Sequence, residues 1–423
     1  MKFSDFGNKF SQQAGIASLM DDLGNSLSED SDMIMMGGGN PAHIPEIQHY
    51  FKQRLSKICT SERELQRIIG IYDPPQGNVE FIQSLTTLLN SEYSWGLSPE
   101  NIAITNGSQA AFFMLFNLFA GAVKGENDRV IQLPIAPEYI GYSDVGLSES
   151  FFEFTKPIIE EIDSESFKYH IDFDEFSVSA QTAAVCVSRP TNPTGNVLTN
   201  TEITRLDEIS RQSNVPLIID GAYGTPFPSL IFGSAEPIWN NNIILCLSLS
   251  KFGLPAARTG IVIANAEVIQ AISRMNAVLN LASGNFGSLL ALELVKNKKI
   301  LELSQKVIRP YYFEKAQRAE SLLKQLLQGL PFSLHKVEGA MFLWLRLKDC
   351  PVSNQELYIL LKQQGVLIVS GHHFFPGFDA DSCGEWVHTR ECIRITYSQE
   401  QSTVERGLRM IAKVIHQVYQ LGV

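Results

Sequence analysis

The run Ile243-Ile244-Leu245-Cys246-Leu247-Ser248-Leu249-Ser250-Lys251 combines the clearest indications of fold and chemistry in this chain. Its five apolar residues in a row are typical of a strand that is buried on both faces, as in a parallel sheet. Arg258 follows one short loop later. A lysine amine at a strand end can form an imine with an aldehyde cofactor, and nearby hydroxyls and a guanidinium can hold that cofactor's phosphate. Alone, the run also fits an ordinary surface loop.

Comparable apolar runs recur through the middle of the chain and alternate with helix-like segments. We predict strands at 101–105, 130–133, 183–187, 215–219, 243–247 and 260–264, and helices at 108–119 and 202–212. This alternation predicts an α/β fold with a mostly parallel mixed sheet and helices on both faces.

The pattern changes after Gly287. A helix-rich stretch, 289–327, is interrupted near Arg309-Pro310. Further strands are expected at 342–347, 366–369 and 392–396, and helices at 354–364 and 403–420. We therefore expect a large cofactor-binding domain (51–300), a small α+β domain (301–423), and an N-terminal segment (1–50) that joins the small domain.

Composition limits the possible functions. The 423 residues fit two or three domains at roughly 100–200 residues each. The net charge of −11 argues against a general nucleic-acid or anionic-membrane surface. The six cysteines form no C-x-x-C pair, and no apolar run approaches the ~20 residues that span a bilayer. We expect a soluble, cytoplasmic protein without structural disulfides.

Most polar candidates follow the C-terminal end of a predicted strand, where open α/β sheets bind ligands. Gly107-Ser108-Gln109 opens a helix after strand 101–105, and free N–H groups there favour a phosphate. Ser108 as a plain N-cap is the alternative. Asp220, after strand 215–219, can keep a ring nitrogen protonated, and Tyr223 can reach a phenolic oxygen of the same ring. A turn aspartate and a half-buried tyrosine are the alternative.

Two further loops follow strands. Asn192 lies between Pro190 and Pro193, in a loop stiff enough to present its amide to a cofactor oxygen, unless the loop is only a turn. Tyr139, in Ala136-Pro137-Glu138-Tyr139, could stack on a planar ring, although a core or surface aromatic is the more frequent outcome for a single tyrosine.

Arg394 interrupts an apolar strand and needs a partner, either a substrate carboxylate or a structural ion pair. Gly37-Gly38-Gly39-Asn40-Pro41 is a flexible turn that closes over a ligand or serves only as a linker, and Tyr72 precedes a rigid turn. His372-His373 has no recognised metal-ligand spacing to other side chains, so we expect no metal.

These motifs together resemble the fold type I pyridoxal-phosphate aminotransferases, the aspartate aminotransferase-like group. The resemblance rests on Asn-Pro-Thr-Gly at 192–195, Asp220-x-x-Tyr223, and Ser248-x-Ser250-Lys251 followed by Arg258. It extends from Gly37 to Arg394, nearly the whole chain.

Several stretches are more specifically similar to the branch that exchanges an amino group between L-valine and pyruvate. They are Gly37-Gly38-Gly39-Asn40-Pro41-Ala42, Thr105-Asn106-Gly107-Ser108-Gln109, Ala136-Pro137-Glu138-Tyr139-Ile140-Gly141-Tyr142, Phe167-Lys168-Tyr169-His170 and 188–197. One departure is Pro74, where that pattern leads us to expect glycine.

The resemblance implies roles for the cofactor site. Lys251 carries pyridoxal 5'-phosphate covalently and moves the proton, Asp220 pairs with the pyridine nitrogen, and Tyr139 stacks on the ring. Asn192 and Tyr223 contact the phenolic oxygen. The implied phosphate contacts are Gly107, Ser108, Gln109, Ser248, Ser250, Arg258 and, from the other subunit of a homodimer, Tyr72.

The resemblance also implies that Arg394 holds the substrate carboxylate, with Asn192 and the Gly39 backbone nearby. The cofactor residues do not fix which bond breaks, so a different amino-acid specificity, or a lyase or decarboxylase, stays open. A non-catalytic regulator is disfavoured, because 1–39 is too short for a DNA-binding module. Ile16 and Phe286 are candidates for the side-chain pocket.

Overall fold

The computed structural model describes residues 2–11, 33–148, 150–378 and 385–421. Its larger sheet has seven strands. In spatial order they are β2 (Ile102–Thr105), β10 (Gly260–Ile263), β9 (Ile243–Ser248), β8 (Leu217–Asp220), β7 (Thr182–Ser188), β3 (Val130–Leu133) and β4 (Phe152–Phe154). Only β10 runs antiparallel to its neighbours in this sheet. The predicted α/β fold with a mostly parallel mixed sheet is confirmed.

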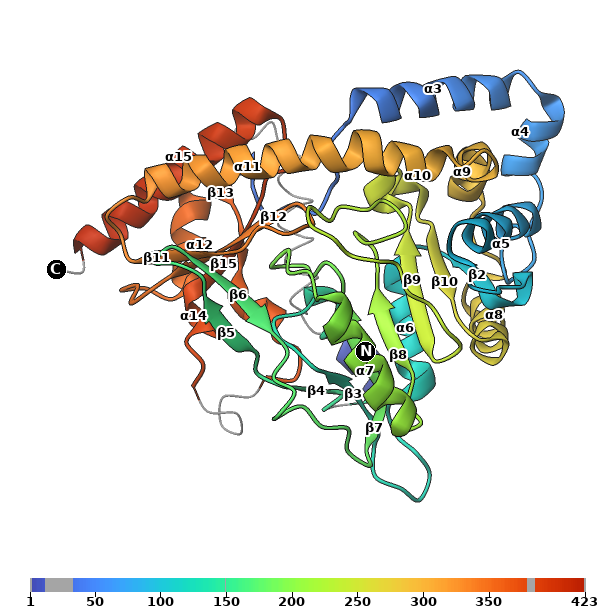
Figure 1. Ribbon diagram of the computed structural model, residues 1–423, viewed down its shortest axis with the longest axis horizontal. Coiled ribbons are helices and arrows are strands. Elements are labelled where there is room, and N and C mark those ends of the chain that lie inside the picture. Colours follow the sequence, from blue (N-terminus) through green and yellow to red (C-terminus); the bar gives the residue numbers. More distant parts are fainter. Residues whose placement is uncertain (1, 12–32, 149, 379–384, 422–423) are drawn as a thin grey trace.

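Both faces of this sheet are covered, which explains the unbroken apolar runs. Along β8, Leu217 and Ile219 pack into one hydrophobic core, whereas Ile218 packs into a second core on the opposite face. Figure 1 shows α7 in front of the sheet and α6 behind it. The helices around this sheet are α5 (Val79–Tyr93), α6 (Ser108–Phe119), α7 (Asn200–Gln212), α8 (Ala266–Asn280) and α9 (Phe286–Lys296).

A second sheet of six strands contains the C-terminal strands. In spatial order they are β14 (Val369–Ser370), β15 (Cys392–Thr396), β12 (Phe342–Leu347), β11 (Phe332–His335), β6 (Ser166–His170) and β5 (Ile158–Glu161). The β5–β6 hairpin thus leaves the larger sheet between β4 and β7 and pairs through β6 with β11. In Figure 1 its green ribbon lies among the orange and red C-terminal elements. The sequence analysis did not assign these two strands.

The predicted strand 366–369 is two strands. β13 (Val366–Leu367) pairs in parallel with β1 (Ile34–Met35), while β14 pairs with β15. The pairing of β1 brings the N-terminal segment to the side of the second sheet and leads it towards the glycine-rich turn.

A nearly continuous helix joins the two parts of the fold. It consists of α10 (Lys299–Leu303), a π-helical turn η5 (Ser304–Ile308) and α11 (Arg309–Leu326). Pro310 has no N–H for helix hydrogen bonding, and the π-turn lies just before it, so the predicted interruption is a change of helix geometry and not a break. Figure 1 shows this helix running across the top of both sheets.

The remaining elements are short or peripheral. They are α1 (Asp5–Ser11), α3 (Pro45–Cys59), α4 (Glu62–Ile69), α12 (Asn354–Gln363), α14 (His388–Glu391), α15 (Gln401–Leu421), and the 3-10 turns η1 (Pro99–Asn101), η2 (Ile140–Tyr142), η3 (Ser250–Phe252), η4 (Pro255–Ala257) and η6 (Gly371–Phe374). Within the described residues, no helix is both long and apolar enough to cross a membrane.

Candidate active site

A cavity of about 180 Å³ lies at the carboxyl ends of the strands of the larger sheet. Its lining brings together twelve of the fourteen site residues proposed from sequence. They are Gly39, Ser108, Gln109, Tyr139, Asn192, Asp220, Tyr223, Ser248, Ser250, Lys251, Arg258 and Arg394. Ser248 and Asp220 are the last residues of β9 and β8, so the strand-end argument correctly predicted where they meet.

The two other predicted residues are not part of the lining, although Gly107 lies beside it. Gly107 is the N-cap of α6, with φ of 87°, and a side chain there would collide with the guanidinium of Arg258. Glycine therefore lets Arg258 approach the free amides of the first turn of α6. Tyr72 is 82% exposed and does not line the cavity of its own chain.

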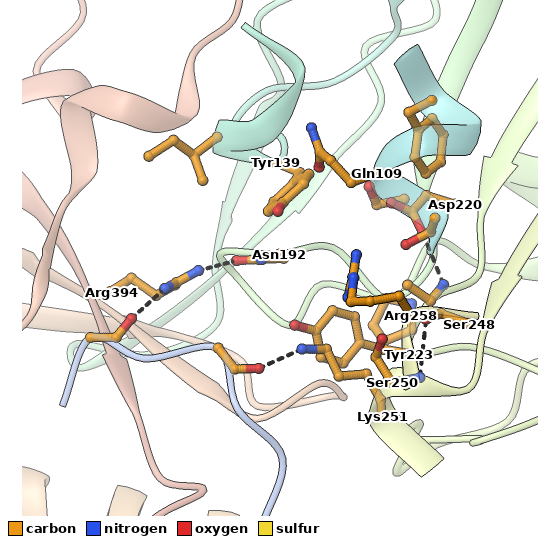
Figure 2. Close-up of a pocket in the computed structure, with 18 residues that line it drawn as sticks. Gln109, Tyr139, Asn192, Asp220, Tyr223, Ser248, Ser250, Lys251, Arg258 and Arg394 are labelled. Atoms are coloured by element: carbon orange, nitrogen blue, oxygen red, sulfur yellow. Dashed lines mark hydrogen bonds between the residues drawn. The ribbon is translucent and has the colours of Figure 1, made fainter. Parts of the chain in front are cut away.

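One end of the cavity is suited to an anion such as a phosphate. The N-terminus of α6, the hydroxyls of Ser248 and Ser250, and the Arg258 guanidinium converge there (Figure 2). The Ser248 hydroxyl accepts from the Ser250 backbone N–H at 3.1 Å, which fixes the turn between β9 and η3.

Asp220 is a buried carboxyl beside this cavity. Oδ2 accepts from the Tyr142 hydroxyl at 2.7 Å and Oδ1 from the Ala222 N–H at 2.9 Å. Burial raises the pKa of Asp220, against these hydrogen bonds and the attraction of Lys251. Among the described residues it forms no ion pair. Such a carboxyl is ready for a cationic ring N–H.

Lys251 projects into the middle of the cavity. Its Nζ donates to the carbonyl of Gly39 at 2.5 Å and lies 5.1 Å from the centre of the Tyr223 ring. Burial lowers the pKa of Lys251 to about 7, and the positive charges of Arg394 and Arg258 act in the same direction. The amine is therefore substantially neutral at neutral pH, as a nucleophile or proton acceptor must be.

Arg394 lies at the end of the cavity opposite Arg258 (Figure 2). Its guanidinium is 3% exposed and donates to Asn192 Oδ1 and to the carbonyl of Gly37, both at 2.7 Å. The Nε atom is buried and has no hydrogen-bond partner within the described part of the chain. Because the partners are neutral oxygens, the charge remains available to an anionic group, and the structural ion pair considered from sequence is not found among the described residues.

Other residues singled out from sequence lie outside the lining. Phe286 is 45% exposed at the start of α9, and Ile16 is outside the described residues. His372 Nδ1 lies 2.8 Å from the Ser370 hydroxyl, away from the cavity lining. Two roles were not predicted from the sequence: Ser188 lines the cavity, and the Tyr142 hydroxyl donates to Asp220. A usable signal for Tyr142 was a polar aromatic in an otherwise apolar turn.

Fold and site together define an α/β enzyme with a reactive lysine between two anion-binding ends. The model of the family described as aminotransferase class I and II matches residues 38–411. The chain is 45% identical to valine–pyruvate aminotransferase of Escherichia coli over 99% of both chains.

Two solved structures are also similar over almost the full length. A putative amino-acid aminotransferase from Psychrobacter arcticum is 45% identical, with a TM-score of 0.96 and 99% of both chains covered. Valine–pyruvate aminotransferase from Salmonella typhimurium is 44% identical, with a TM-score of 0.87, 96% of this chain and 100% of that one. This chain belongs to the class I and II aminotransferases, whose cofactor is pyridoxal phosphate.

The residues present fit that cofactor. The buried carboxyl of Asp220, which forms no ion pair with any described residue, would suit a pyridinium N–H. The cradle between Gly107, Arg258 and the serines would suit a phosphate. The amine of Lys251, with its lowered pKa, suits an aldehyde.

Proposed function

We propose that this chain transfers the amino group between L-valine and pyruvate, giving 3-methyl-2-oxobutanoate and L-alanine. The observation that carries the reaction type is one cavity in which a lysine amine with its pKa lowered to about 7 lies between a phosphate cradle and a buried, charged arginine. The identity of 45% to the Escherichia coli protein, over nearly all of both chains, supports the substrate pair.

Each charged residue has a separate task. Pyridoxal phosphate, when bound, supplies an electron sink for the charge left when the substrate α-carbon loses its proton. Lys251 Nζ accepts that α-proton and later returns it, and its lowered pKa makes both transfers feasible near neutrality. Asp220, as a carboxylate, holds the ring nitrogen in its cationic form.

Arg394 fixes the substrate by its α-carboxylate. Its unpartnered Nε and its neutral hydrogen-bond partners leave the guanidinium able to bind an anion, and Asn192 orients it. A held carboxylate directs the α-hydrogen towards Lys251, which is the positioning that a proton transfer requires.

The composition of the cavity supports an uncharged substrate side chain. Among the described lining residues the cations are Lys251, Arg258 and Arg394, and each already has a task. No further described cation in the lining is available for a second carboxylate, which favours valine over aspartate. Phe112 and Ile140 add apolar surface.

An amino-donor panel with pyruvate as acceptor tests this proposal. The holoenzyme should form alanine from valine faster than from aspartate, glutamate or phenylalanine. A flat response to valine with a strong response to aspartate would refute the substrate pair. Ammonia release from valine without any acceptor would indicate a lyase instead.

We further propose that the enzyme is a homodimer whose cofactor phosphate is also contacted by Tyr72 of the second copy. Exposed apolar side chains occur on α4, α8 and the segments beside them. Figure 1 shows that these elements lie on the same side of the molecule. They are Ile69, Ile71, Tyr72, Val79, Val278, Leu279, Leu281 and Phe286.

Sedimentation should give twice the mass of one chain, and Tyr72→Phe should weaken cofactor binding. A monomer with full activity contradicts both.

The described cysteines support a cytoplasmic location. Unpaired thiols suit a reducing compartment. The described cysteines that are unpaired are Cys59, Cys186, Cys246, Cys350 and Cys392.

A further inference from the structure

Glu138 is a carboxyl with no exposed surface, and it lies outside the cavity lining. Its Oε1 accepts from the Ser188 backbone N–H at 2.8 Å, and its Oε2 lies 2.5 Å from the Ser188 hydroxyl. Among the described residues it forms no ion pair. A buried carboxylate without a cation is costly, so this side chain requires an explanation.

The contacts of Glu138 continue towards the cavity. The Ser188 hydroxyl lies 3.3 Å from the Tyr142 hydroxyl, and the Tyr142 hydroxyl donates to Asp220 Oδ2 at 2.7 Å. Four side chains thus form one buried row that starts at Glu138 and ends on Asp220, the carboxyl that faces the cavity.

The hydrogen-bond pattern of this row depends on whether the Glu138 carboxyl is ionised or protonated. If Glu138 is ionised, the Ser188 proton points to it, Tyr142 receives no hydrogen bond from Ser188, and two buried carboxylates are negative. If Glu138 is neutral, it donates to Ser188, Ser188 donates to Tyr142, and Tyr142 donates to Asp220. Only the second arrangement gives each hydroxyl one donated and one accepted hydrogen bond.

We propose that Glu138 is a positioning residue that stays neutral and orders Ser188 and Tyr142 into a one-way row of donors, which keeps Asp220 ionised for the cofactor ring. The role of the ring rests on the proposed aminotransferase function. The row itself does not, because it consists only of side chains of this chain.

The surroundings of Glu138 agree with a neutral form. The pKa of Glu138 is raised to about 8, chiefly by burial and also by the charge of Asp220, against the hydrogen bonds from Ser188 and from the Tyr139 N–H. Burial also raises the pKa of Tyr142, a member of the row, and of the thiols of Cys186 and Cys246, which lie near its carboxyls. The cation Lys251 lies near Asp220, and its charge opposes the rise of the Asp220 pKa. On the side of η6, the Phe374 carbonyl accepts a hydrogen bond from the Glu138 N–H. Two histidines lie on η6. His372 Nδ1 is 2.8 Å from the Ser370 hydroxyl, and burial lowers the pKa of His373 against the charge of Asp144.

Two variants separate a neutral donor from a carboxylate. Glu138→Gln keeps the pattern of the neutral form, because its oxygen can accept from the Ser188 N–H and its amide can donate to the Ser188 hydroxyl, but it cannot titrate. Glu138→Leu removes the donor. We expect Glu138→Leu to lower kcat about tenfold, and Glu138→Gln to restore most of that loss.

Infrared spectra of the cofactor-free protein test the proposal independently of activity. The wild type should show the carbonyl band of a protonated carboxyl below about pH 8 that fades above it, and Glu138→Gln should lack this band. In the holoenzyme, the absorption of the bound cofactor should change across the same pH range in the wild type and not in Glu138→Gln.

Several results would overturn the proposal. A wild type without the band below about pH 8 would show an ionised Glu138, and Glu138→Gln as inactive as Glu138→Leu would show that the negative charge is needed. If Glu138→Leu does not fold, the infrared band and the Glu138→Gln spectra still decide. If transamination itself is not found, a band that titrates in the cofactor-free protein leaves the row intact and refutes only the proposed function.

Discussion

Lys251, in the middle of the cavity, and Arg394, at one end of it, have similar surroundings but different chemistry. Both cations donate to a carbonyl of the same N-terminal segment, Lys251 to Gly39 and Arg394 to Gly37. Burial lowers both pKa values, to about 7 for Lys251 and about 10 for Arg394. The same desolvation thus makes a base of the amine and leaves the guanidinium charged.

The neighbours strengthen this difference. Arg394 and Arg258 add to the lowering of the Lys251 pKa, whereas Tyr223 and Tyr139 oppose the lowering at Arg394. The Arg394 guanidinium also lies over the rings of Phe342 (4.2 Å) and Phe374 (5.2 Å), which stabilise a cation.

Removing the base should have the largest effect. Lys251→Ala should lower kcat by about 10³–10⁴-fold, since it removes both the nucleophile and the proton acceptor. Mass spectrometry after borohydride reduction should show the cofactor fixed to the wild type and not to the variant. A variant that keeps full turnover, or a reducible imine at another lysine, would contradict the assignment.

Removing the positive charge of Arg394 should have a smaller effect than removing Lys251, and it should act on substrate binding. Arg394→Gln should lower kcat/KM by about 10²-fold, because the substrate carboxylate loses a buried cationic partner. The absorption of the bound cofactor should stay as in the wild type, since Arg394 lies at the opposite end from Arg258. Loss of cofactor binding in this variant would mean that the two ends are not separate.

The smallest effect is a shift in titration. The folded-state pKa of Lys251 lies below the ordinary value of 10.5, so the amine should gain reactivity as the pH rises through about 7. Acylation of the cofactor-free protein, followed by peptide mapping, measures this midpoint, and Lys251→Met is the control that identifies the peptide. Arg394→Gln should raise the midpoint, because it removes a repelling charge. A midpoint near that of a free lysine would contradict the desolvated site.

The sequence predicted those parts of the fold that are locally encoded. The bounds of β3, β12 and β15 match because each is a mostly apolar segment, interrupted by one long polar side chain (Gln132, Arg346 or Arg394). The hairpin of β5 and β6 was not predicted, since Glu160, Glu161 and Lys168 leave it without an apolar run. Its place in the second sheet depends on pairing with β11, which lies far along the chain.

The site shows the same division. Asp220 and Ser248 end strands and were predictable from position, whereas Tyr142 and Glu138 act through contacts that only the folded chain creates. The predicted strand 366–369 is divided in two for the same reason, a contact between distant parts of the chain. Val366 and Leu367 pair with β1 of the N-terminal segment, whereas the next strand pairs with β15.

The path of the β5–β6 hairpin has a consequence for how the protein is made. Ser166 and Phe167 pair with Leu334 and His335, so the second sheet closes only after most of the chain has left the ribosome. Until then, β6 has an unpaired edge that must be kept from other nascent chains. A fragment consisting of 301–423 would lack β6, so the edge of β11 would be unpaired. We therefore expect this fragment not to fold on its own.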